Sequence, residues 1–266
     1  MKPKLSPAQE KVKRKLNYHY KYFDFTKISP DPLEFPHRFI NYYDIEISSF
    51  ISAIFAYGNV TQIIKTLETI HEAMGESPHE FILNYSEEIG QKYFDILKHR
   101  FYTSNDIHNL FLGLQKIYTV YGSLKYLFLL YYFEKDPGIK ESLSFFANNL
   151  LSITCENKAP SRGIKFMFPD PLKGSACKRF NLFLRWMVRK DELDFGLWFE
   201  IDPRKLIIPV DTHVAAIGKN LRLTRSKIIS WKMAEEITAK LKLFDEQDPV
   251  KYDFAICHIG MRKMDF

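Results

Sequence analysis

The sequence predicts an all-α protein, and three observations support this prediction. Apolar residues recur at helical spacing, for example at positions 47, 50, 51, 54 and 55, and again at 107, 110, 111, 114 and 117. Helix-start signals, in which Ser or Asp precedes Pro, occur along the whole chain. No segment shows the two-residue alternation of a half-buried strand. Residues 207–210 could be extended, but this run is short and contains a proline.

The N-terminal half begins with a helix whose first residues are Ser6-Pro7-Ala8-Gln9, the pattern of a capping box with proline at the first helical position. Residues 24–36 hold three prolines and are predicted to form a loop. Ser77-Pro78-His79-Glu80 then repeats the helix-start pattern. These signals predict helices separated by short connections before residue 150.

Two longer loops are predicted in the C-terminal half, at residues 157–173 and 190–209, and Asp248-Pro249 is expected to start the last helix. We expect residues 1–30 to be a helical N-terminal extension and residues 31–266 to form one helical domain. The functional loops are expected in the C-terminal half.

Composition favours a globular, basic protein. Hydrophobic residues make up 46% of the 266 residues, enough for a packed core. The net charge of +6 and the isoelectric point of about 9.0 favour a polyanionic partner. The N-terminus lacks the apolar segment of a signal peptide, and the longest apolar run is too short to span a bilayer. We therefore expect a cytoplasmic protein with no membrane role.

The three cysteines, Cys155, Cys177 and Cys257, lie far apart in the sequence. No pair has the CxxC spacing of a structural zinc site, and an iron–sulfur cluster needs four closely spaced cysteines. The pattern predicts neither a metal site nor a cluster, and it fits a reducing compartment.

Lys178 opens an apolar-periodic segment after Gly174-Ser175-Ala176-Cys177. On a helical wheel, Lys178, Leu182, Arg185 and Arg189 share one face, while the aromatic and aliphatic residues share the other. One interpretation is a groove for phosphates with Lys178 as a nucleophile. The alternative is a solvated basic face on a surface helix, which is the commoner explanation of such a pattern.

Asp211 follows the apolar run 207–210 and precedes a segment with helical periodicity at Val214, Ile217 and Leu221. It therefore occupies a predicted N-cap, where aspartate stabilises a helix by roughly 1 kcal/mol relative to alanine. The same position suits a catalytic carboxylate, because helix amides keep it ionised. Taken alone, Asp211 is explained by capping and His213 by a place on the helix surface.

Together these two elements resemble motifs of the helix-hairpin-helix DNA glycosylase superfamily. The superfamily carries Gly-x-x-x-Lys at a helix start, matched here by residues 174–178, and a later apolar-Val-Asp-Thr-His segment, matched by residues 209–214. The usual Gly-x-Gly hairpin is reduced to a single glycine. The interval between the motifs is more similar to that of the archaeal 8-oxoguanine glycosylase branch, and the chain as a whole resembles an uncharacterised bacterial family within the superfamily.

The resemblance implies an all-α, glycosylase-like fold of two helical subdomains with a cleft between them, and a hairpin and active-site region at about residues 165–222. It implies a DNA glycosylase with AP lyase activity, in which Lys178 forms a Schiff base and Asp211 assists. DNA-contacting residues carried over by the resemblance are Lys173, Gly174, Ser175, Arg185, Asn59, Gln62 and His213. Damaged duplex DNA is the implied partner, and no cofactor is expected.

Aromatic residues in the C-terminal half could stack on a base, although we expect each of them to belong to the core; they are Phe166, Phe168, Trp186, Trp198 and Trp231. Three other functions stay open. The chain could be a non-catalytic DNA- or RNA-binding protein, a glycosylase without lyase activity, or a helical interaction protein with no nucleic-acid role.

Overall fold

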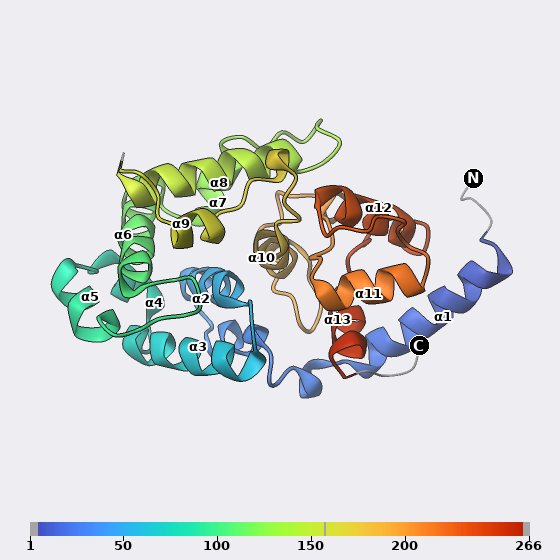
Figure 1. Cartoon of the computed structure of the whole chain (residues 1–266), viewed down its shortest axis with the longest axis horizontal. Coiled ribbons are helices and arrows are strands. Elements are labelled where there is room, and N and C mark those ends of the chain that lie inside the picture. Colours follow the sequence, from blue (N-terminus) through green and yellow to red (C-terminus); the bar gives the residue numbers. More distant parts are fainter. Residues whose placement is uncertain (1–4, 157, 263–266) are drawn as a thin grey trace. The chain divides into compact units, whose positions relative to one another are not determined.

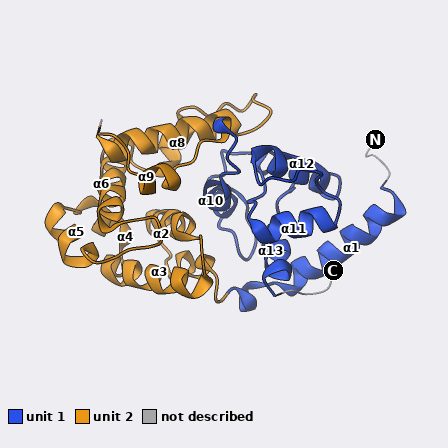
Figure 2. Cartoon of the chain, in the orientation of Figure 1, with its two compact units in different colours: residues 1–28, 173–266 blue, residues 29–172 orange. Residues whose placement is uncertain are grey.

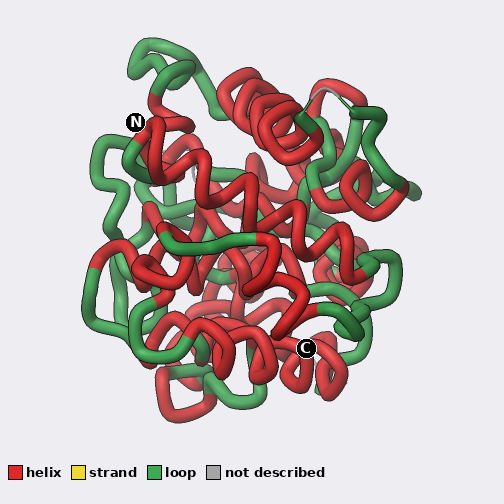
Figure 3. Tube along the Cα trace, turned by 90° about the vertical axis from the view of Figure 1, so that its left-hand side faces the viewer, coloured by secondary structure: helices red, strands yellow, loops and turns green. Residues whose placement is uncertain are grey.

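The computed structural model describes residues 5–156 and 158–262. The described residues form helices joined by loops and turns, with two isolated β-bridges and no strand (Figure 3). The all-α prediction is therefore confirmed. The chain divides into two compact units, drawn in blue and orange in Figure 2: unit 1 comprises residues 1–28 and 173–266, and unit 2 comprises residues 29–172.

Unit 2 is built around one helix that is buried except for its first two residues. It contains α2 (Tyr42–Phe55), α3 (Val60–Met74), α4 (Pro78–Leu83), α5 (Glu87–Phe94), α6 (Ser104–Tyr121), α7 (Leu124–Leu129), α8 (Lys140–Cys155) and α9 (Arg162–Met167) (Figure 1). Every residue of α2 from Asp44 onward is buried, and α2 contacts α3 and α4. A helix that is covered on all sides forms the centre of its unit.

A buried carboxylate on α2 connects it to α6 and α7. Glu46 is fully buried and accepts hydrogen bonds from the Tyr118 hydroxyl at 2.6 Å and the Leu124 amide at 3.0 Å. These donors compensate for the loss of water around the carboxylate, which would otherwise destabilise the fold.

Unit 1 contains α1 (Pro7–Tyr22), α10 (Lys178–Val188), α11 (Thr212–Asn220), α12 (Trp231–Lys242) and α13 (Asp253–Met261) (Figure 1). Helix α13 packs against both α1 and α11. The ring of Phe23, just after α1, contacts Phe254 and His258 of α13. The first helix thus belongs to the unit formed by the C-terminal segment, which differs from the predicted extension with a boundary at residue 30.

Capping residues start the helices largely where the sequence predicts. Ser6 forms a capping box with Gln9, and Ser77 caps α4. The predicted loop at residues 24–36 instead contains three short 3-10 helices, and α9 lies inside the predicted loop at 157–173. The last helix begins at Asp253 rather than at Asp248-Pro249, because the Asp248 carboxylate binds Arg189 at 2.8 Å instead of capping a helix.

Candidate active site

Asp211 is the N-cap of α11, as predicted. Its Oδ1 accepts hydrogen bonds from the backbone amides of His213 and Val214, both at 2.9 Å. With Oδ1 occupied by the helix, Oδ2 is the oxygen that faces other side chains. The capping explanation is therefore correct, and it leaves half of the carboxylate available for a second role.

Lys178 is the first residue of α10, and its Nζ lies 3.5 Å from Asp211 Oδ2. The two side chains are 28% and 19% exposed, so the pair is partly desolvated yet open to solvent. Two helix starts that are far apart in the sequence thus bring an amine and a carboxylate to ion-pair distance. This is the arrangement that the two motifs predicted.

The environment of Asp211 keeps its carboxylate ionised. Burial acts to raise the pKa of Asp211, but the charge of Lys178, the amides of Val214 and His213 and the charge of the His213 ring together lower it below its usual range. Asp211 is thus ionised at neutral pH. One of its oxygens pairs with the Lys178 cation, and the other accepts hydrogen bonds from the α11 amides.

The loop before α10 is an exposed turn that ends in an unusual conformation. Lys173 closes a short 3-10 helix, Gly174 follows with φ +87°, and both are exposed. The Ser175 hydroxyl accepts the Cys177 amide at 3.2 Å, and the Gly174 carbonyl accepts the Trp231 amide at 3.0 Å. Lys173, Gly174 and Ser175 lead into the helix that Lys178 starts. Their contacts with DNA stay a prediction.

Cys177 starts α10 from the left-handed region, at φ 46° and ψ 40°, and is buried. A non-glycine residue in this region costs free energy, so the surrounding packing has to hold it there. Such strained positions are commoner at functional sites than elsewhere. The strain lies one residue before Lys178.

The prediction that α10 exposes a basic face to solvent or phosphates is wrong at Arg185 and Arg189. Arg185 is 2% exposed, and its guanidinium binds Asp194 Oδ1 at 3.1 Å and Asp253 Oδ2 at 2.5 Å. Arg189 is also buried and pairs with Asp194 and Asp248. Arg185 therefore cannot contact DNA as predicted. The helical wheel is right about which residues share a face, but acidic residues of unit 1 cover that face instead of solvent.

Helix α13 completes the surroundings of the Lys178–Asp211 pair, and the sequence prediction missed it. Asp253 binds the buried guanidinium of Arg185 on α10. Burial raises the pKa of Asp253 to about 6, although the charge of Arg185 acts to lower it. One turn later, Cys257 Sγ lies 3.8 Å from Asp211 Oδ2. The i, i+4 spacing of Asp253 and Cys257 puts them on one face of α13, which is the signal that the sequence offered.

The remaining predicted site residues have separate places. His213 lies in the first turn of α11, half-buried. Asn59 caps α3 by accepting the Thr61 amide at 2.9 Å, and Gln62 is exposed in the first turn of that helix. Both residues belong to unit 2, whereas Lys178 and Asp211 belong to unit 1. The contacts of Asn59 and Gln62 with DNA stay a prediction.

Most of the aromatic stacking candidates belong to the core, as expected. Three tryptophans and one phenylalanine are at most 4% exposed; they are Trp186, Trp198, Trp231 and Phe168. Phe166 is 37% exposed and packs against Tyr57 and Phe101 within unit 2. None of the four buried rings is available to stack on a base.

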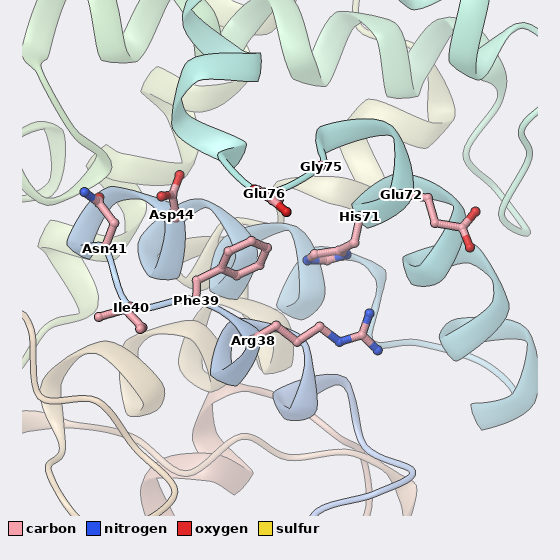
Figure 4. Close-up of a pocket in the computed structure, with 9 residues that line it drawn as sticks. All are labelled: Arg38, Phe39, Ile40, Asn41, Asp44, His71, Glu72, Gly75 and Glu76. Carbon is pink, nitrogen blue, oxygen red and sulfur yellow. The ribbon is translucent and has the colours of Figure 1, made fainter.

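A cavity of about 630 Å³ lies in unit 2 (Figure 4). Its lining includes the acidic side chains of Asp44, Glu72 and Glu76, whereas its arginine, Arg38, is bound by Glu68 at 2.6 and 2.7 Å. Carboxylates without a neighbouring free cation repel a polyanion. This cavity is therefore unsuited to nucleic acid.

A second cavity, of about 510 Å³, lies in unit 1 between α1, the end of α11 and α12. Three exposed cationic side chains line it, those of Lys11, Arg222 and Lys240, and no acidic residue does. We call this hollow the basic groove. It provides the cationic surface that α10 does not.

Within residues 5–156 and 158–262, no three His, Cys, Asp or Glu side chains are placed to hold a metal ion. None of the helices in the described ranges combines the length and hydropathy needed to cross a membrane.

Comparison with known proteins identifies one family. The family model DUF2400, described as a protein of unknown function, matches residues 31–262. The chain therefore belongs to this family. No curated protein and no solved structure matches the chain.

Proposed function

We propose that this member of family DUF2400 is a DNA base-excision glycosylase with AP lyase activity, on a helix-hairpin-helix glycosylase-like fold. The observation that carries the proposal is the 3.5 Å approach of Lys178 Nζ to Asp211 Oδ2 at two helix starts. An amine can form an iminium with an opened sugar, which a hydroxyl cannot, and a carboxylate stabilises a cationic transition state.

The target nucleotide leaves the duplex before the reaction, at a cost of a few kcal/mol of unstacking. Lys178 then attacks the anomeric carbon while the bond to the base breaks. The proton that Lys178 loses passes through Asp211 to the departing base, so the carboxylate is ionised again as the sugar becomes cationic. The sugar ring then opens to an iminium as the ring oxygen takes a proton from the attached amine. Loss of the C2′ proton to the ionised Asp211 carboxylate expels the 3′ phosphate by β-elimination, which breaks the strand on the 3′ side. These steps use only the amine and the carboxylate and need no iron–sulfur cluster or metal.

Asp211 suits this role because its two oxygens are used differently. The α11 amides hold Oδ1 and thereby fix the side chain. Oδ2 takes no part in the cap; it faces Lys178 Nζ and Cys257 Sγ and is the oxygen that would face the reacting sugar. A fixed carboxylate needs little reorganisation as charge develops in the transition state, which is the main advantage of a preorganised site.

Damaged duplex DNA is the proposed partner, in the cytoplasm of the cell. The net charge of +6 and the basic groove support a polyanionic ligand. The groove lies at the C-terminal end of α11, the helix that Asp211 caps at its N-terminal end, so phosphates flanking the target nucleotide have a cationic surface in the same unit.

Borohydride trapping tests the chemistry. The protein is mixed with duplexes that contain 8-oxoguanine, an oxidised pyrimidine or an abasic site, and borohydride is added to reduce any Schiff base. We expect a covalent adduct that is lost in Lys178→Gln and kept in Lys232→Gln, a matched change of an exposed lysine on α12. No adduct on any of the duplexes would refute the lyase activity.

Base-release and binding assays of the same variants separate the alternatives. A glycosylase without lyase activity would release the base, would need Asp211 and would not need Lys178. A non-catalytic DNA- or RNA-binding protein, which the basic groove alone would serve, would bind equally well in Lys178→Gln and Asp211→Asn. An interaction protein would show no salt-dependent binding of nucleic acid at all.

Binding measurements test the groove. Each phosphate contact that is lost lowers the slope of log affinity against log salt by about 1. The triple variant Lys11→Ala, Arg222→Ala and Lys240→Ala is therefore expected to bind duplex DNA more weakly and with a slope reduced by up to about 3. An unchanged slope would exclude the groove from the DNA-binding surface.

A further inference from the structure

We infer that Cys257 is a positioning residue of the active site: its thiol donates a hydrogen bond to Asp211 Oδ2 and holds that oxygen toward Lys178. The inference rests on the proposed function for its effect on catalysis, but the contact itself can be tested without any enzyme assay. The observation behind it is the 3.8 Å distance from Cys257 Sγ to Asp211 Oδ2, within hydrogen-bond range for sulfur.

Asp211 has a different donor for each of its lone-pair regions. The backbone amides of His213 and Val214 hold Oδ1, whereas Lys178 and Cys257 both approach Oδ2. Lys178 sits on a long and partly exposed side chain, so it restrains the carboxylate weakly. The cysteine side chain has one rotatable bond and is carried by a buried helix. Cys257 is therefore the rigid donor at Oδ2.

The packing of α13 explains why Cys257 reaches Asp211. Gly260, three residues later on the same face, lies so close to α11 that an added Cβ would stand 2.8 Å from the Cβ of His213. Glycine thus permits the close approach of α11 and α13. On the other side of Cys257, Asp253 binds Arg185 of α10 at 2.5 Å.

These three residues form one stripe along α13, at i, i+4 and i+7. Asp253 fixes α13 to the helix of Lys178, and Gly260 fixes it to the helix of Asp211. Cys257 lies between these two attachments, at the point where the ends of α10 and α11 meet. Helix α13 therefore sets the geometry of the pair, and Cys257 is the side chain that transmits it.

Kinetics of base release test the positioning role. Removing a hydrogen bond to a charged group that is fixed for catalysis is expected to lower kcat about tenfold in Cys257→Ala, with KM within about twofold of the wild type. Cys257→Ser retains a donor and should recover most of kcat. Cys155→Ala, a change of a comparably exposed cysteine on α8, should leave both constants unchanged. An unaltered kcat in Cys257→Ala would overturn the inference.

Alkylation by iodoacetamide tests the contact independently of activity. The carboxylate that accepts the S–H bond opposes formation of the reactive thiolate, and the Lys178 cation favours it. We expect the alkylation rate of Cys257, followed by mass spectrometry, to rise about threefold in Asp211→Asn and to fall in Lys178→Gln. Cys155 in the same molecules is the internal control, and its rate should not change.

The two arms distinguish the failure of each proposal. If the wild type forms no adduct with any DNA, the proposed lyase activity fails, and the alkylation rates still decide whether Cys257 donates to Asp211. If trapping succeeds but the rate at Cys257 is the same in wild type and Asp211→Asn, the positioning role is refuted while the proposed function stands.

Discussion

Replacement of Asp211 separates its structural role from its proposed catalytic role, because the structure assigns a different oxygen to each. Asparagine at an N-cap is about as good as aspartate, since its side-chain oxygen accepts the same amides. Asp211→Asn should therefore keep the hydrogen bonds from His213 and Val214 and lose only the charge that faces Lys178. Asp211→Ala loses both.

The expected magnitudes follow from these contacts. Loss of the cap costs about 1 kcal/mol. The ion pair with Lys178 is partly exposed, at 28% and 19%, so it contributes less, about 0.5 kcal/mol. We expect the free energy of unfolding to fall by about 0.5 kcal/mol in Asp211→Asn and by about 1.5 kcal/mol in Asp211→Ala. The corresponding fall in Tm is about 1–2 °C and 3–6 °C.

Urea denaturation at pH 7 measures the stability, and borohydride trapping measures the chemistry. Both variants should lose trapping, although only Asp211→Ala loses appreciable stability. The folded state lowers the pKa of Asp211 from its ordinary value of 3.8, so the charge adds stability above that pH and ceases to do so as the pH falls through the folded pKa. The difference in the free energy of unfolding between wild type and Asp211→Ala should therefore become smaller in acid. Full trapping by Asp211→Asn would refute the catalytic role, and wild-type stability of Asp211→Ala would refute the cap.

Three further outcomes are expected. Arg185→Met leaves the buried Asp253 carboxylate without the cation that binds it and Asp194 with Arg189 alone, so it should lower the free energy of unfolding by about 3–5 kcal/mol. Arg204→Met, an exposed control, should change the free energy of unfolding by less than about 0.5 kcal/mol. Equal effects of the two variants in urea melts would contradict the buried network. Gly260→Ala should destabilise unit 1 by about 1–3 kcal/mol, because the added Cβ would meet α11. Gly138→Ala is the control, since nothing lies within 4 Å of an added Cβ there, and it should be tolerated. Comparable thermal stability of the two variants would argue against the close approach of α11 and α13. Burial lowers the pKa of His71 from 6.5 to about 4, so the unfolded chain binds a proton at a higher pH than the folded protein does. The free energy of unfolding should therefore fall by up to about 3 kcal/mol as the pH drops from 6.5 to 4. The urea midpoint of the wild type should fall over this pH range and that of His71→Gln should fall less, and the same pH dependence in both would rule out His71 as the source.

The sequence by itself was sufficient to predict the helical class and most helix starts. Capping side chains act on amides within three residues of themselves, so Ser6, Ser77 and Asp211 could be recognised without knowledge of the fold. For the same reason, Lys178 and Asp211 could be singled out as polar residues at two helix starts. Their identity was predictable because local hydrogen bonding determines it.

Only the tertiary structure decided what surrounds this pair. A helical wheel shows that Lys178 and Arg185 share a face, but it does not show what covers that face. In the folded protein the Arg185 end meets buried carboxylates, whereas the Lys178 end meets Asp211. The place of Cys257 beside Asp211 likewise depends on the packing of α13 against α11 and on the ion pair of Asp253 with Arg185 of α10. Contacts between elements distant in the sequence depend on packing, which local periodicity does not encode.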